Sequence, residues 1–145
     1  MAQVKLSRAW QPDLDLLSER VLVVDDDPRV LVALRRVLES NGYEVDTAAT
    51  PEVALALAAT GVYAVLAVDL CLPKMHGLDL LPLLLRQQPD ASYIIASGYL
   101  NGQATTLPGL RGNCHLVPKP WEPDVLCHAV EDGIEGFQAR RRGEM

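Results

Sequence analysis

The chain has 145 residues, of which 49% are hydrophobic, and its formal net charge is −6. This length is typical of one domain with a full hydrophobic core, and the negative charge argues against a protein that binds nucleic acid by neutralising phosphates. No apolar run has the length of a membrane span or the form of a secretory signal, so we expect a cytoplasmic protein without a membrane partner.

Short apolar runs, rich in β-branched residues, recur along the chain from residue 21 onward. They are typical of strands that are buried on one or both faces of a sheet. They predict five strands, over residues 21–25, 43–47, 63–69, 92–97 and 115–117. Helical periodicity fills the intervals, and it predicts helices within residues 28–42, 51–59, 77–88 and 121–142.

Local signals indicate where these helices begin and end. Pro28 suits a first turn, and Gly42 suits the stop that follows the first helix. Thr50 is expected to be the N-cap of the second helix, which Gly61 closes. Pro82 is expected to be tolerated in the third helix because it falls within the first turn. Between the fourth and fifth strands, the glycines and prolines leave room for only a short helix.

Strands that alternate with helices favour a parallel sheet with right-handed crossovers. The predicted fold class is therefore α/β, a three-layer doubly wound five-stranded parallel sheet. In such open sheets, functional groups gather where the strands end, at their carboxyl ends.

Polar side chains follow the ends of four predicted strands, and they are Asp25, Asp26, Asp69, Ser97 and Lys119. Three carboxylates and one ammonium carry two net negative charges, which a bound divalent cation would balance. Oxygen ligands in a partly solvated cleft suit Mg²⁺. Asp27 directly precedes a helix and is most simply its N-cap.

Two Cys-His pairs, Cys114-His115 and Cys127-His128, raise zinc as an alternative metal. Adjacent residues point in different directions in a strand or a helix, so neither pair converges naturally on one ion. The three cysteines are odd in number and widely spaced, which favours reduced thiols over disulfides.

Four motifs resemble the receiver domain of two-component response regulators, and the chemotaxis receiver is one such domain. They are VLVVDDDP (21–28), AVDLCLPKMHGLDLL (67–81), IIASGY (94–99) and LVPKPW (116–121), and they occur in the family's order. The resemblance covers roughly residues 20–138. It implies a flavodoxin-like sheet with strand order 2-1-3-4-5.

The resemblance also implies a signalling role rather than an enzyme's. Asp69 would accept a phosphoryl group from the phosphohistidine of a sensor histidine kinase or phosphotransfer protein. Lys119 would pair with that group, and Ser97 would hydrogen-bond it once formed. Any enzymatic activity would be limited to self-phosphorylation and autodephosphorylation. The phosphorylated domain would switch its binding to a downstream protein that the sequence does not identify.

The same resemblance implies how Mg²⁺ would be held. Asp26 and Asp69 would bind the metal directly, Asp25 would bind it mainly through water, and the backbone carbonyl of Cys71 would complete the protein ligands. The Lys119-Pro120 peptide bond is expected to be cis, which would aim the lysine into the site.

The sequence departs from the family at Leu116, where many receivers carry a switching Tyr or Phe. Without that ring, phosphorylation is expected to act by ordering residues 98–112. Two other functions stay open. One is a pseudoreceiver that is never phosphorylated, and the other is a haloacid-dehalogenase-like phosphatase that uses Asp25 and Asp27.

The expected domain boundaries are an N-terminal extension over residues 1–20, a receiver domain over 21–138 and a basic tail over 139–145. The extension could form an accessory helix, contact a second protomer in a homodimer, or be disordered. The sequence does not choose between a stand-alone receiver and part of a longer protein.

Overall fold

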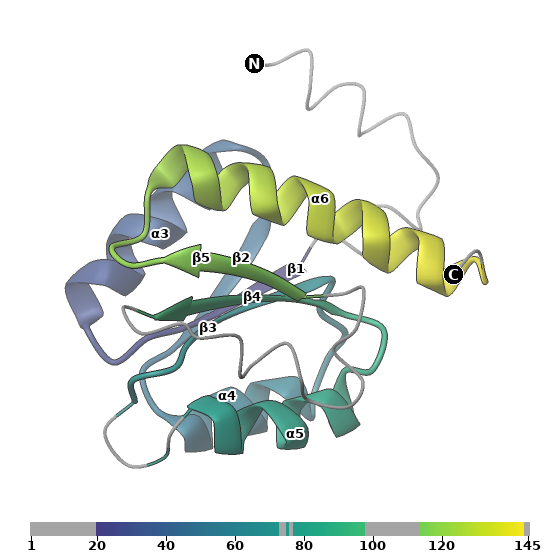
Figure 1. Ribbon diagram of the computed structural model, residues 1–145, viewed down its shortest axis with the longest axis horizontal. Helices are drawn as coiled ribbons and strands as arrows, with labels where there is room; N and C mark the ends of the chain where they lie inside the picture. The colour runs from purple at the N-terminus through teal and green to yellow at the C-terminus, as the bar shows by residue number, and fades with distance from the viewer. Residues whose placement is uncertain (1–19, 73–74, 76, 98–113, 144–145) are drawn as a thin grey trace.

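A computed structural model describes residues 20–72, 75, 77–97 and 114–143 of the chain. These residues form a parallel sheet between two pairs of helices (Figure 1). The strands are β1 (Arg20–Val24), β2 (Glu44–Ala48), β3 (Val65–Asp69), β4 (Ser92–Ser97) and β5 (Cys114–Pro118). The helices are α3 (Pro28–Ser40), α4 (Pro51–Ala58), α5 (Gly77–Gln87) and α6 (Pro123–Arg141).

The strand order is β2-β1-β3-β4-β5, and each neighbouring pair is parallel. Helices α3 and α6 cover one face of the sheet, and α4 and α5 cover the other (Figure 1). The predicted fold class, a three-layer doubly wound sheet with order 2-1-3-4-5, is confirmed. The order changes direction between β1 and β3, so their carboxyl ends form the switch point at which such folds bind ligands.

The core has one layer on each face of the sheet. Every residue of the central strand β3 is buried, which explains its unbroken apolar sequence before Asp69. One layer joins the sheet to buried leucines of α3 and to Leu126, Ile134 and Phe137 of α6. The other layer joins it to small residues of α4 and to leucines of α5. Both layers hold β1 and β3 rigidly, and with them the residues at the strand ends.

Three of the predicted helix signals are seen in the structure. The side chain of Asp27 caps α3 by accepting a hydrogen bond from the amide of Arg29 at 2.9 Å. After α3, Gly42 has a φ of 96°, a left-handed conformation that glycine adopts without the strain that other residues would suffer. Thr50 is likewise the N-cap of α4, because its hydroxyl accepts a hydrogen bond from the amide of Val53 at 3.2 Å.

The helix predicted within residues 51–59 ends one residue earlier, and Gly61 does not close it. Helix α4 ends at Ala58, and Thr60 satisfies the end of the helix instead. The Thr60 hydroxyl and amide both donate to the carbonyl oxygen of Leu57, at 3.0 and 3.1 Å. A side-chain hydroxyl therefore does what a glycine turn was expected to do.

The prediction that Pro82 falls in a first turn was also wrong. Helix α5 begins at Gly77, which places Pro82 inside the helix, beyond its first turn. A proline there removes one helical hydrogen bond. The Pro82 side chain itself is exposed.

β5 is an edge strand, and its last residue is Pro118. An edge position tolerates proline because one side of the strand has no neighbour that needs an amide donor. Leu116 on this strand is 39% exposed. The predicted short helix, the segment 98–112 and the extension before Arg20 lie outside the described residues. Among the helices that the structure describes, none is long and apolar enough to cross a membrane.

Candidate functional site

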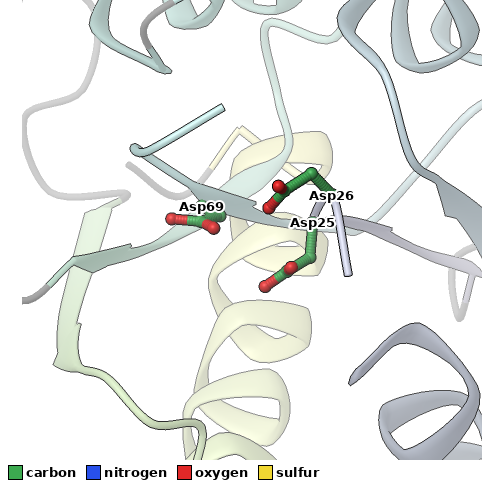
Figure 2. Close-up of side chains that lie close together, drawn as sticks. All are labelled: Asp25, Asp26 and Asp69. Atoms are coloured by element: carbon green, nitrogen blue, oxygen red, sulfur yellow. The ribbon is translucent and has the colours of Figure 1, made fainter. Parts of the chain in front are cut away.

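Three carboxylates meet at the switch point of the sheet. Asp25 and Asp26 directly follow β1, and Asp69 is the last residue of β3. The two strands are hydrogen-bonded neighbours, with Val24 opposite Val68. One carboxylate oxygen from each aspartate lies within 4.8 Å of the others, and Figure 2 shows the three side chains gathered at the strand ends. Neighbouring parallel strands thus bring together residues that are more than 40 positions apart in the sequence.

Asp69 is fixed from two sides. Its side chain is only 1% exposed. The amide of Cys71 donates to Oδ1 at 2.9 Å, and the ammonium of Lys119 donates to Oδ2 at 2.8 Å. Both contacts are charge-assisted, and they leave a buried carboxylate with one preferred orientation.

Asp25 is equally buried, and donors reach both of its oxygens. The amide of Asp27 donates to Oδ1 at 2.9 Å. The indole nitrogen of Trp121 donates to Oδ2 at 3.0 Å, and Lys119 lies 3.4 Å from the same oxygen. A buried carboxylate needs such donors because little water reaches it.

Lys119 follows β5 and joins the two buried carboxylates. Partial burial alone would lower the pKa of its ammonium group, but the hydrogen bond to Asp69 and the charges of Asp25 and Asp69 outweigh it, so the pKa is raised. The lysine is therefore a permanent positive charge in the site. The Lys119-Pro120 peptide bond is cis, as predicted.

Asp26 differs from its two neighbours because its side chain is exposed. Within the described ranges of the chain, no hydrogen bond or ion pair engages its carboxylate. Asp27, by contrast, lies outside the three-carboxylate cluster. It pairs with Arg29 as the helix cap, which argues against a phosphatase that uses Asp25 and Asp27 together.

Two predicted site residues are placed only in part. The backbone of Ser97 ends β4, opposite Pro118 of β5, but its side chain lies outside what the structure describes. Cys71 lies beside Asp69 and contacts it through its amide. The proposed role of the Cys71 carbonyl as a metal ligand therefore stays a prediction.

Sequence reasoning missed Trp121. It was treated as the start of the last helix, but it precedes α6 and reaches back to Asp25. The available signal was its position, directly after the Lys119-Pro120 pair that directs the chain toward the site.

The chemistry of the cluster fits a divalent cation. Its three carboxylates and one ammonium carry two net negative charges, and its donor atoms are all oxygens, which hard cations such as Mg²⁺ and Ca²⁺ prefer. Among the Asp, Glu, His and Cys residues that the structure describes, these three aspartates form a cluster whose ligand atoms lie close enough together to hold one ion. The Cys-His pairs suggested for zinc do not form such a group there.

Comparisons with known proteins agree with this geometry. The family model described as the response regulator receiver domain matches residues 21–131. The nitrogen assimilation regulatory protein NtrX of Azorhizobium caulinodans is 28% identical over 86% of this chain, but the match covers only 28% of NtrX. This chain thus corresponds to a small part of that longer regulator.

Two solved structures have the same fold. A CheY-like response regulator receiver domain protein from Methanospirillum hungatei has a TM-score of 0.76 and 27% identity, with 85% of this chain and 98% of that one covered. The response regulator protein TrrA from Thermotoga maritima, solved in complex with Mg²⁺-BeF, has a TM-score of 0.68 and 30% identity, with 79% and 98% covered. With its fold, its three-aspartate cluster and these relatives, the chain belongs to the response regulator receiver domain family, the phosphoacceptor signalling domains of two-component systems.

Proposed function

We propose that Asp69 is the phosphoacceptor of this receiver domain and that it takes a phosphoryl group from the phosphohistidine of a sensor histidine kinase or phosphotransfer protein. The observation that carries the proposal is the surroundings of Asp69. It is a buried carboxylate 2.8 Å from a lysine and beside two further carboxylates at the switch point of the sheet. An isolated buried aspartate would destabilise the fold, whereas this one accepts from an ammonium group at one oxygen and from a backbone amide at the other.

The transfer is a direct displacement at phosphorus. A carboxylate oxygen of Asp69 attacks, the new P–O bond forms, and the P–N bond to the donor histidine breaks as the imidazole leaves. The Cys71 amide holds the carboxylate in one orientation. The Lys119 ammonium lies where the phosphoryl oxygens would arrive, and it stabilises their negative charge.

Mg²⁺ is the proposed metal, with Asp25, Asp26, Asp69 and the carbonyl of Cys71 as the residues that would hold it. When bound, the ion neutralises charge on the phosphoryl oxygens. Support comes from the all-oxygen donor set and from the Mg²⁺-BeF complex of TrrA. Asp26 suits direct ligation because it is exposed and has no protein partner in the described part of the chain. Asp25 suits ligation through water because donors reach both of its oxygens.

Ser97 is proposed to hydrogen-bond the phosphoryl group and so to signal its presence to a downstream protein partner. The proposed receiver domain spans residues 21–138, between the extension 1–20 and the tail 139–145. Self-phosphorylation and autodephosphorylation are its only proposed enzymatic steps. The activity of any longer protein that contains this domain would depend on its other parts.

Beryllofluoride binding tests the proposal without a kinase, because the BeF₃⁻ group resembles a phosphoryl group on aspartate. Fluorine NMR of the full chain with Mg²⁺ should show a bound signal, and Asp69→Asn should lose it. Lys119→Met should weaken the signal, whereas Arg35→Gln on the exposed side of α3 should leave it unchanged. An equal signal in Asp69→Asn would refute the assignment, and no signal in the wild-type chain would favour the pseudoreceiver.

A further inference from the structure

The buried indole of Trp121 contacts the site from a side chain that has no role in the proposed phosphotransfer. Trp121 is 9% exposed and packs in the same core layer as Leu31 of α3 and Leu126 of α6. Its ring is therefore fixed by packing. Its only polar atom, Nε1, donates to Asp25 Oδ2 at 3.0 Å.

The ammonium of Lys119 contacts both buried carboxylates but lies closer to one of them. Lys119 lies 2.8 Å from Asp69 but 3.4 Å from Asp25. The indole occupies the Asp25 oxygen that faces the lysine, and the amide of Asp27 occupies the other. Without the indole, Oδ2 would be left to the lysine alone, and the carboxylate could rotate toward it and away from the position that serves the metal.

A buried tryptophan N–H must be paired with some acceptor, and a backbone carbonyl would serve stability equally well. In this structure the acceptor is a carboxylate of the acidic cluster. The contact therefore connects the core packing of α3 and α6 to the orientation of Asp25.

We infer that Trp121 is a positioning residue of the metal site, which orients Asp25 for Mg²⁺ through the indole N–H. The inference rests on the proposed Mg²⁺ site. Removing a residue that hydrogen-bonds a metal ligand without touching the metal typically lowers metal affinity by about 10- to 100-fold.

The test compares Mg²⁺ affinity in the full chain by calorimetry for wild type, Trp121→Phe and Phe137→Leu. Phenylalanine keeps an aromatic ring but lacks the donor, and we expect it to weaken Mg²⁺ binding about tenfold. Phe137 is buried in the same core layer on α6 and is remote in sequence from the site, so Phe137→Leu serves as the packing control. It should lower the melting temperature and leave Mg²⁺ affinity within about twofold of wild type.

A spectroscopic readout separates positioning from packing. In the Trp10→Phe chain, the single indole N–H signal in a proton-nitrogen NMR spectrum belongs to Trp121. It should shift on addition of Mg²⁺, with the same affinity that calorimetry gives. If Trp121→Phe does not fold, benzothienylalanine at position 121 replaces only the N–H by sulfur and should give the same tenfold loss.

Three results would overturn the inference: Mg²⁺ affinity within twofold of wild type when the N–H is removed, an equal loss in Phe137→Leu, or an indole signal that does not respond to Mg²⁺. Normal Mg²⁺ binding by the wild type in those cases would leave the proposed function intact. A wild-type chain that binds no Mg²⁺ would instead refute the proposed metal site itself.

Discussion

Asp25 and Asp26 are adjacent in the sequence, yet their surroundings are opposite. Asp25 is buried and reached by donors at both oxygens, whereas Asp26 is exposed and has no partner in the described part of the chain. At the residue scale, the two aspartates are therefore suited to different tasks. Asp25 is part of the framework of the site, and Asp26 is the side chain most available to a metal.

Asp26→Ala should weaken Mg²⁺ binding by at least about tenfold, because it removes the proposed direct ligand. It should also raise the metal-free melting temperature by about 2 °C, because it relieves repulsion among three carboxylates within 4.8 Å. Calorimetry and thermal unfolding in EDTA measure the two effects. Normal Mg²⁺ affinity in this variant would contradict the ligand assignment, whatever happens to the melting temperature.

A second polar cluster lies at the other end of the sheet and serves stability. The Tyr63 hydroxyl and the Arg20 guanidinium both donate to Asp46 Oδ2 at 2.7 Å. Burial tends to raise the pKa of the Asp46 carboxyl, but the hydrogen bonds from Tyr63 and Arg20 outweigh it and hold the pKa below its usual value. Because the folded pKa is depressed, this stabilisation is present above the unfolded pKa and is lost as pH falls through the folded one.

Asp46→Asn should therefore destabilise the chain by about 1 kcal/mol at pH 7, a modest figure because solvent screens the partly exposed pair. The difference from wild type should shrink below about pH 4, where the wild-type carboxylate takes up its proton. Urea unfolding across this pH range measures it. Glu44→Gln is the matched control, because Glu44 is 78% exposed and 3.9 Å from the same arginine. A difference that persists unchanged at pH 3 would contradict this account.

At the scale of the elements, α6 packs closely against the sheet at Gly133. The hydroxyl of Ser92 donates to the Gly133 carbonyl at 2.6 Å. A Cβ added at Gly133 would lie 2.9 Å from Val65 Cγ2 and 3.1 Å from Ser92 Cβ, and both of these residues are buried. The absence of a side chain at this position lets the helix pack directly on β3 and β4.

Gly133→Ala should destabilise the chain by about 1–3 kcal/mol, because buried atoms must move to admit the methyl group. Gly136→Ala, one turn further along α6, is the control. The nearest atom to its Cβ would be the terminal nitrogen of Arg140 at 3.2 Å, so its effect should be about 0.5 kcal/mol or less. Urea unfolding of both variants gives the comparison, and equal losses would disprove the close-packing explanation.

Sequence patterns predicted the elements better than their ends. Features that follow from local chemistry were predicted correctly. They are the burial of the strands, the helix caps at Asp27 and Thr50, and the turn at Gly42. The residue that closes α4 was not predicted, because the threonine hydroxyl of Thr60 can satisfy a helix end as well as a glycine turn can. The convergence of the three aspartates could be predicted, since parallel strands end at one edge. The Trp121 contact was missed, because its position after Lys119-Pro120 places it near the site but does not show which acceptor its indole reaches.

For the molecule as a whole, the strand order places two net negative charges at one edge of a rigid sheet. A cation that binds only the folded state must stabilise it. Mg²⁺ at a hundredfold excess over its Kd should raise the free energy of unfolding by about 2.7 kcal/mol, and EDTA should reverse the effect. Urea unfolding with and without Mg²⁺ measures this. An equal gain in the Asp26→Ala chain would indicate that the ion binds elsewhere.

The central claim is that Asp69 accepts a phosphoryl group, and intact-mass spectrometry tests it most directly. The full chain is incubated with acetyl phosphate and Mg²⁺, and its mass is compared with that of Asp69→Asn treated in the same way. We expect the wild-type chain to gain one phosphoryl group and Asp69→Asn to gain none. Equal labelling of the two chains, or no labelling of the wild type, would contradict the claim.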